Sequence, residues 1–179
     1  MMVKSLYSST WVHAFQHITI YIYVIMGISL SRVVSIAIPL CSGTVIGLGQ
    51  RNEVAAWFPT IKKPSWMPPN WLFGPVWTVL YTMMGIASHR VYEQAGLFSK
   101  PMALYVIQLM LNLAWSPLFF TYHALGAALL DITALVGFLG ATILEFAKYD
   151  VVASRLMLPY LGWTCFATAL TYNIWLENS

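Results

Sequence analysis

Charged residues are scarce in this sequence, at 8% of 179 residues, whereas hydrophobic residues make up 59%. The mean hydropathy is +0.71. A soluble fold could not cover this much apolar surface with so few charges, so the sequence predicts a membrane protein. Nine Lys and Arg against six Asp and Glu give a net charge of +3 without a basic run. This spread excludes the basic patch that nucleic-acid binding requires, and we expect no nucleic-acid partner.

Cysteine and the usual catalytic patterns are also nearly absent. Cys41 and Cys165 lie inside apolar segments, which excludes a disulfide framework or a cysteine metal site. His13 and His17 are four residues apart and would share the face of a helix, but they lack a third ligand. No phosphate-binding glycine loop occurs, and no motif joins a nucleophile to a base. We therefore predict no catalytic residue, no metal site and no obligatory cofactor.

One acidic residue, Asp131, falls about two turns into an apolar segment. An ionisable side chain at membrane depth is a functional candidate by default. No second acid or base accompanies it, so the sequence predicts no proton relay. We expect its carboxyl group to be hydrogen-bonded to an adjacent helix.

Five apolar segments follow one another along the chain, at residues 33–49, 73–92, 100–120, 126–147 and 156–176. An α-helix of about twenty residues crosses the hydrocarbon core and satisfies its own backbone hydrogen bonds. The sequence predicts an all-α, polytopic membrane protein in which residues 32–179 form one domain, a bundle of five transmembrane helices. Polar turns are expected at Tyr122 and His123 and from Lys148 to Arg155.

Residues 1–31 are predicted to be an N-terminal extension. Residues 14–31 are apolar and about long enough for a signal-peptide core or a marginal span, although His17 weakens both interpretations. A mitochondrial presequence needs several arginines, and only Lys4 and Arg32 are available. We expect an accessory membrane-associated segment that serves as an anchor or a targeting signal.

The stretch from Lys62 to Tyr81 holds four prolines and three tryptophans. Each proline fixes φ and restricts the residue before it, so Lys63 to Asn70 is predicted to be non-helical and stiff. A stiff loop loses little entropy when it closes over a ligand. We therefore predict that the first loop, residues 51–70, covers a pocket, with the flat ring of Trp66 in the cover.

Aromatic and amide side chains recur at helical spacing in three of the predicted spans. Residues three or four apart share a face, and the amides of Gln108 and Asn112 should turn away from lipid. These faces predict a pocket for a flat, mostly apolar ligand. The alternative is ordinary helix packing, with the amides bonded between helices. The faces consist of Trp77, Tyr81, Met84 and Ser88; of Tyr105, Gln108, Asn112, Trp115 and Phe119; and of Tyr160, Trp163, Ala167 and Leu170.

Four motifs carry a resemblance to a known family. They are KPSWxPP at residues 63–69, GPxW at 74–77, QLxxNxxWxP at 108–117 and PYLxWxxFA at 159–167. Together they closely resemble the translocator protein family, which is also called the tryptophan-rich sensory protein or peripheral-type benzodiazepine receptor family. The resemblance covers residues 33–179 in order and with few gaps.

The resemblance implies a five-helix bundle, often a homodimer, whose first loop caps a pocket for porphyrins such as protoporphyrin IX or heme-type tetrapyrroles. Synthetic benzodiazepine-site ligands and cholesterol are further ligands of the family. It also implies the outer mitochondrial membrane for a eukaryotic protein and an envelope membrane for a bacterial one. By motif position, the ligand-binding residues are Trp66, Trp77, Asn112, Trp115, Trp163, Ala167 and Leu170.

Two positions depart from the family pattern. The sterol motif at the end of the last span should read apolar, Tyr, basic, but its residues are Leu170, Tyr172 and Leu176. The missing cation lowers the expectation of sterol binding. Ala127 stands where a pocket-side Trp often follows the opening Gly126, and we expect a larger pocket or an altered ligand preference.

Three functions remain after this reading. A membrane receptor or transport protein for porphyrins and lipids is favoured by the predicted pocket. Degradation of bound porphyrin is supported only by oxidisable tryptophans, and a scaffold or stress-sensing role only by the N-terminal extension.

Overall fold

The computed structural model describes residues 29–179. The chain divides into two compact units, Met1–Val34 and Ser35–Ser179. His13, His17 and nearly all of the expected N-terminal extension lie outside the described residues. The second unit carries the bundle and the site, and all packing below belongs to it.

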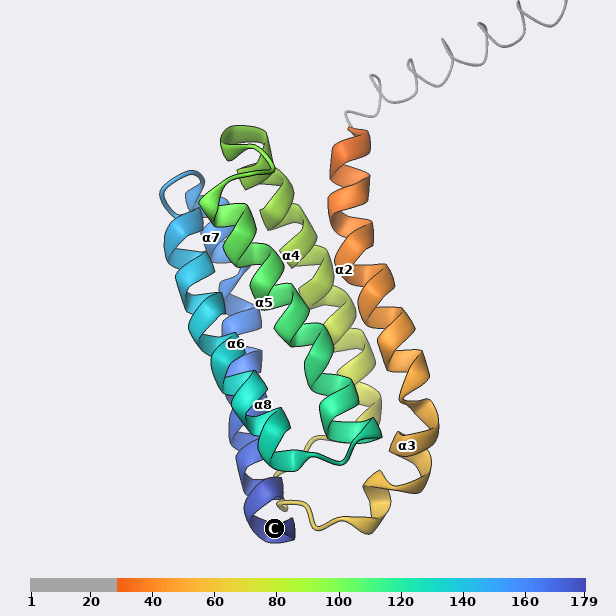
Figure 1. The fold of residues 1–179 in the computed structure, drawn as a ribbon. Helices are drawn as coiled ribbons and strands as arrows, with labels where there is room; N and C mark the ends of the chain where they lie inside the picture. Colours follow the sequence, from red (N-terminus) through yellow and green to blue (C-terminus); the bar gives the residue numbers. More distant parts are fainter. Residues whose placement is uncertain (1–28) are drawn as a thin grey trace, which may run out of the picture. The chain divides into compact units, whose positions relative to one another are not determined.

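The described chain is helical, and no strand occurs in residues 29–179 (Figure 1). The all-α class is therefore confirmed. Three stretches, Leu30–Gly49, Lys100–Thr121 and Leu125–Phe146, are long and apolar enough to cross a membrane. The long helices are α2 (Leu30–Gly49), α4 (Phe73–Ala95), α5 (Lys100–Ser116), α6 (Leu125–Phe146) and α8 (Leu158–Asn178); the short ones are α3 (Arg51–Ala56), η1 (Phe58–Thr60), η2 (Asn70–Leu72), η3 (Pro117–Thr121) and α7 (Val151–Leu156).

Local sequence explains where several helices begin and end. Gly96, with φ of 76°, ends α4 in a conformation that costs glycine little. Pro101 lies in the first turn of α5, where its missing N–H leaves no hydrogen bond unmade. The stretch from Lys148 to Arg155 is not a turn throughout, because the Asp150 carboxylate accepts a hydrogen bond of 2.9 Å from the Ala153 N–H and starts α7.

The first loop also contains more helix than expected. Residues 51–56, which lack proline, form α3, and η1 follows directly. The non-helical prediction is confirmed for residues 63–69, where the prolines cluster, whereas Asn70 already begins η2. In Figure 1, α3 and the chain after it cross the end of the bundle at which α8 finishes.

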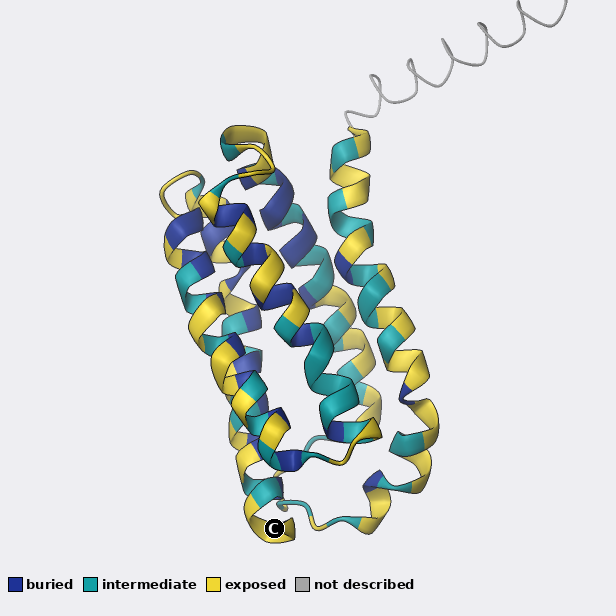
Figure 2. Ribbon diagram, in the orientation of Figure 1, coloured by how far each residue is buried: buried dark blue, intermediate teal, exposed yellow. Residues whose placement is uncertain are grey.

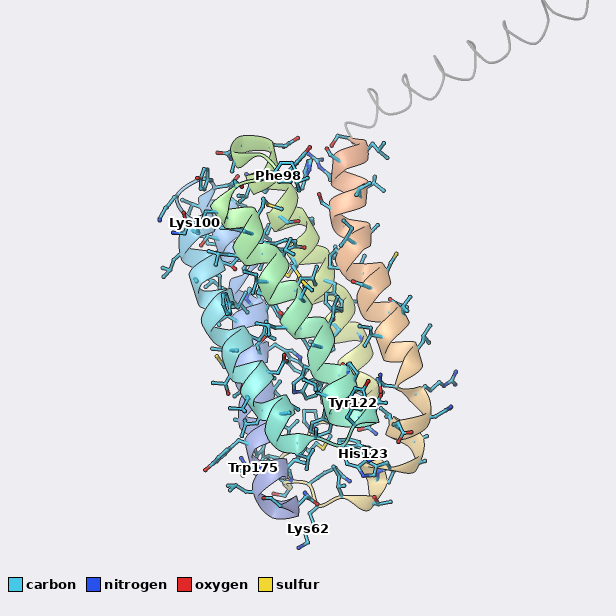
Figure 3. All side chains as sticks on the ribbon, viewed as in Figure 1. Lys62, Phe98, Lys100, Tyr122, His123 and Trp175 are labelled. Atoms are coloured by element: carbon cyan, nitrogen blue, oxygen red, sulfur yellow. The ribbon has the colours of Figure 1, made fainter. Side chains whose placement is uncertain are left out.

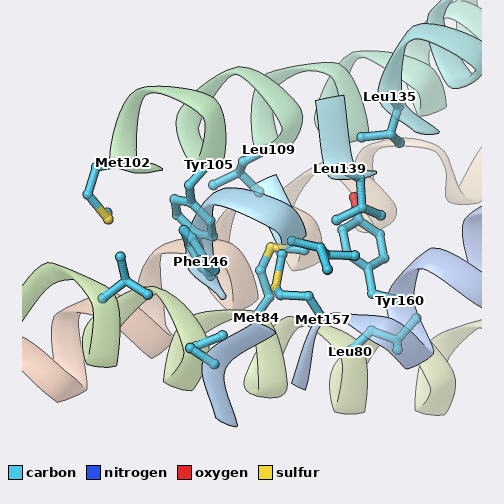
Figure 4. Packing of buried hydrophobic residues seen from close by; sticks show 14 of the residues in the cluster. Leu80, Met84, Met102, Tyr105, Leu109, Leu135, Leu139, Phe146, Met157 and Tyr160 are labelled. Carbon is cyan, nitrogen blue, oxygen red and sulfur yellow. The ribbon is translucent and has the colours of Figure 1, made fainter. Parts of the chain in front are cut away.

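The helices pack around two clusters of buried hydrophobic side chains. α5 lies along α6, α6 lies along α8, and α4 packs against α5 and α7. The inward-facing stripes predicted for α4, α5 and α8 are buried or half-buried, as Figure 2 shows by colour. Figure 4 shows Phe146 beside Tyr105, with ring centroids 6.2 Å apart. A second cluster, at the end covered by the first loop, contains Phe58, Phe119, Leu125, Ala128, Leu170 and Ile174.

Two glycines bring α2 close to α4. A Cβ on Gly85 would lie 2.5 Å from the Cα of Ile36, so a larger residue there would push the backbones apart. A Cβ on Gly43 would collide with the ring of Tyr81. These contacts set the position of the cavity wall that α2 provides.

Candidate ligand cavity

A cavity of ≈ 480 Å³ lies inside the second unit, beneath the first loop. Helices α2, α4, α5, α6 and α8 supply its walls, and the first loop contributes Phe58 and Met67. The lining is mainly apolar and aromatic, as is usual for sites that take small organic ligands. The aromatic members are Phe58, Phe73, Trp77, Tyr81, Trp115, Phe119, Phe120 and Trp163.

Six of the seven residues that the sequence selects for ligand binding line this cavity. They come from three helices: Trp77 from α4, Asn112 and Trp115 from α5, and Trp163, Ala167 and Leu170 from α8. Helical spacing was sufficient to bring them together, because each group lies on one face of its helix.

Trp66 lies outside the cavity lining. Its side chain is 45% exposed and packs edge-on against Phe166, with ring centroids 5.7 Å apart. The neighbouring Met67 lines the cavity instead. The chain turns here, because the Met67 N–H donates to the Pro64 carbonyl over 3.1 Å, and this turn directs Trp66 away from the cavity that Met67 lines.

An interhelical hydrogen bond lies in the cavity wall. The Tyr81 hydroxyl donates to the Asn112 Oδ1 over 2.7 Å. Trp77 stacks on Tyr81 with centroids 5.3 Å apart, and it meets Tyr160 edge-on at 6.0 Å. The sequence left two interpretations of Asn112 open, a pocket residue or an amide that bonds between helices. Asn112 does both, because it lines the cavity and accepts the hydrogen bond from Tyr81.

Two indole N–H groups in the wall have no hydrogen-bond partner among residues 29–179. They belong to Trp115 and Trp163. Trp115 stacks on Phe119 at 5.0 Å, and Trp163 meets Phe73 edge-on at 5.7 Å, so ring packing fixes both side chains. Buried donors normally find an acceptor. Both nitrogen atoms are themselves buried in the wall, so they are left unpaired without being exposed to the cavity.

The expected hydrogen bond of Asp131 is not formed. Its buried Oδ2 has no partner in the described part of the chain.

The first loop is attached to α8 near the end of that helix. The Lys62 N–H donates to the Asn178 Oδ1, and the Asn178 Nδ2 donates to the Lys62 carbonyl, each over 2.9 Å. The Lys63 ammonium donates to the carbonyl groups of Phe58 and Ile61 over 2.6 and 2.8 Å. Sequence reasoning missed Asn178, since its partner lies 116 residues away and no local pattern marks the pair.

The three sterol-motif residues do not share one surface. Leu170 is buried and lines the cavity, whereas Tyr172 and Leu176 are 47% and 52% exposed on the outside of α8.

Ala127 is exposed and lies outside the cavity lining, so the expectation that it enlarges the pocket is wrong. The reason is helical phase, because Ala128 and not Ala127 turns toward the core.

Ion pairs gather at the opposite end of the bundle. Arg90 Nη2 lies 2.7 Å from Asp150 Oδ2, and Glu145 Oε2 lies 2.7 Å from Lys148 and 3.4 Å from Lys100. Partial burial raises the pKa of Asp150, but the Ala153 N–H and the Arg90 guanidinium lower it more, so the pKa lies below its usual value.

Comparison with known proteins finds a family match and several relatives of similar sequence. The model of the TspO/MBR family matches residues 35–176, which begin where the second unit begins. The translocator protein of Homo sapiens is 41% identical over 131 residues, covering 71% of this chain and 78% of the relative. The tryptophan-rich protein TspO of Chlorobaculum tepidum is 40% identical over 148 residues (78% and 94%), and that of Archaeoglobus fulgidus is 40% identical over 152 residues (84% and 98%). The resemblance drawn from the four motifs is confirmed.

Proposed function

We propose that this chain, which belongs to the TspO/MBR family of integral membrane proteins, is a receptor or transport protein that binds porphyrins in the cavity beneath its first loop. The observation that carries the proposal is a cavity with mainly aromatic and apolar walls, to which Asn112 adds one amide. A tetrapyrrole such as protoporphyrin IX has the matching chemistry, with a flat apolar ring and carboxylates that accept hydrogen bonds. The volume of ≈ 480 Å³ falls in the range of ligand pockets.

All five long helices are proposed to cross the bilayer. α4 has 23 residues and α8 has 21, which at 1.5 Å per residue suffices for a hydrocarbon core of about 30 Å. Their charged side chains lie near one end, as Arg90 and Glu93 do in α4 and Glu177 does in α8. A homodimer, in the outer mitochondrial membrane of a eukaryote or an envelope membrane of a bacterium, completes this proposal.

Cholesterol is proposed as a weaker ligand that binds from the bilayer side of α8. Tyr172 and Leu176 are exposed there and can meet a sterol ring system. No Lys or Arg follows Arg155 in the sequence, so the headgroup end of such a site lacks a cation.

Titration of the purified protein with protoporphyrin IX, followed by tryptophan quenching, tests the porphyrin proposal. Trp115→Ala should weaken binding by about 0.5–1.5 kcal/mol, because it removes one stacking surface from the cavity wall. Trp71→Ala is the matched control, since Trp71 is 71% exposed and lies outside the cavity lining. Equal affinities in wild type and Trp115→Ala would contradict the proposal.

Light-dependent degradation of the bound porphyrin is the second candidate function. Three oxidisable indoles, those of Trp77, Trp115 and Trp163, line the same cavity. Absorbance of the protein-bound pigment under illumination tests this candidate. Bleaching faster than with free pigment, and slowed in Trp115→Ala at full occupancy, would favour it over simple binding.

A further inference from the structure

The start of the first loop is fastened to the turn between η3 and α6 by contacts between distant residues. The Thr121 hydroxyl donates to the Gln50 Oε1 over 2.7 Å. His123 Nε2 lies 3.3 Å from Glu53 Oε2, and the imidazole stacks on the Trp57 ring with centroids 3.9 Å apart and planes 14° apart. Figure 3 labels His123 at this position. Because α3 leads into Phe58 and Met67, which line the cavity, these contacts hold the cover in place.

His123 adopts a backbone conformation that is uncommon for a residue with a side chain. Its φ of 52° is the only positive value at a non-glycine position in residues 29–179. Histidine is among the residues that tolerate this region, but the strain persists only where surrounding contacts maintain it. The contacts with Glu53 and Trp57 supply that support. The turn thus presents the imidazole to α3 in one fixed direction.

Solvent reaches this pair. The side chains of His123 and Glu53 are 41% and 40% exposed, and His123 lies two residues beyond the span that ends at Thr121. An imidazole is the side chain whose charge changes between about pH 5 and 8.

We propose that His123 is a pH-sensitive latch that holds the first loop closed over the cavity. The protonated ring is attracted to the Glu53 carboxylate and to the face of Trp57. The neutral ring keeps only a hydrogen bond and the stacking contact. The closed position is therefore favoured at low pH and weakened at high pH. The latch itself is independent of any ligand, and only its effect on ligand release rests on the proposed function.

Other ionisable groups of α3, the turn and the first loop do not reverse the expected pH dependence of loop closure. α3 also carries Arg51, the turn carries Tyr122, and the loop carries Lys62 and Lys63. Within residues 29–179, Glu53 is the only carboxylate within 4.0 Å of the His123 ring nitrogens. The Lys63 ammonium is engaged by two loop carbonyl groups. The pair of Glu53 with His123 thus sets the response to pH.

Hydrogen exchange of the full-length protein in detergent tests the latch without a ligand. Amides of residues 51–60 are compared between wild type and His123→Asn at pH 6 and again at pH 8, so that the intrinsic pH effect cancels. Asparagine tolerates positive φ but does not titrate. We expect wild type to be more protected than the variant at pH 6 and the difference to shrink by about two- to five-fold at pH 8. An equal difference at both pH values would overturn the proposal.

Release of protoporphyrin IX, followed by stopped-flow fluorescence, tests the consequence for the cavity. Wild type should release the pigment about two- to five-fold more slowly at pH 6 than at pH 8, relative to His123→Asn measured in the same buffers. Thr121→Val is the matched control, because it removes a contact of the same turn that does not titrate. It should speed release by the same factor at both pH values. Failure of the pigment to bind would refute the proposed function, whereas the exchange experiment would still decide the latch.

Discussion

The Tyr81 hydroxyl and the Asn112 side-chain oxygen form a hydrogen bond of 2.7 Å that joins α4 to α5 in the cavity wall. Both residues also line the cavity, so this bond belongs to the packing of the bundle and to the surface of the cavity. Gly43 on α2 leaves room for the Tyr81 ring, which fixes the donor opposite Asn112.

Tyr81→Phe should destabilise the bundle and alter the cavity together. The change removes one interhelical hydrogen bond and leaves the Asn112 oxygen without its donor, at a cost of about 0.6–2 kcal/mol within a membrane. Thermal unfolding in detergent measures this loss, and porphyrin affinity measures the altered wall. Tyr122→Phe, at a tyrosine that is 71% exposed, serves as the control and should leave both quantities unchanged. An unaltered unfolding midpoint in Tyr81→Phe would show that the bond contributes nothing.

Replacing Pro64, Pro68 and Pro69 with glycine should raise the rate at which porphyrin leaves the cavity. Each glycine gives the open loop more conformations, which favours opening by about 0.4–1 kcal/mol for each replacement. The long helices should stay intact, because their backbone hydrogen bonds lie within each helix. Stopped-flow dissociation measures the rate, and circular dichroism checks the helix content. If the rate stays the same in a folded triple variant, the loop is a passive cap and ligands leave by another route.

Leu176→Arg should strengthen cholesterol binding. Leu176 is 52% exposed near the end of α8, where a guanidinium can reach the membrane surface and supply the cation that the sterol motif lacks. Binding of a photoreactive sterol in bilayers of fixed composition measures the effect, with Leu176→Gln as an uncharged control of similar length. Tight binding by wild type that Tyr172→Ser abolishes would show that the missing cation is unimportant.

Acid should remove the stabilising effect of the Asp150 charge. Its pKa in the folded protein lies below the usual value near 3.8, so the contribution is present above that value and is lost as pH falls through the lower folded pKa. Asp150→Asn keeps a residue that can cap α7 but removes the charge beside Arg90. The unfolding midpoints of wild type and variant should differ most at pH 6 and converge toward pH 3. A constant difference across this range would assign the effect to capping alone.

The sequence predicted the inward-facing surfaces of regular helices, because the helical spacing of three to four residues places several side chains on one face. Trp77, Asn112, Trp115 and Trp163 line the cavity because each belongs to a stripe on a regular helix. The prediction failed at Ala127, which a shift of one residue turns outward. The spacing of inward-facing residues within each long helix does not depend on residues elsewhere in the chain. It could therefore be recognised from the sequence.

Contacts between distant loop residues could not be predicted in this way. Glu53 and His123 are separated by 70 residues, and Lys62 and Asn178 by 116. Their meeting depends on where α5 ends in η3 and on how the first loop crosses the bundle. Neither is encoded in a local repeat, so the fastening of the cover emerged only from the structure.

Helix α2 provides a thin wall between the cavity and the surrounding lipid. Leu40, Gly43 and Gly47 line the cavity, yet Pro39 is the only buried residue of this helix. The wall between the hydrocarbon phase and the cavity is therefore one helix, and it contains two glycines that have no side chain to fill the space. A hydrophobic ligand would then partition into the membrane before it binds to the protein. Its apparent dissociation constant should scale with the amount of lipid in the assay, and occupancy should follow mole fraction in the bilayer instead of concentration in water.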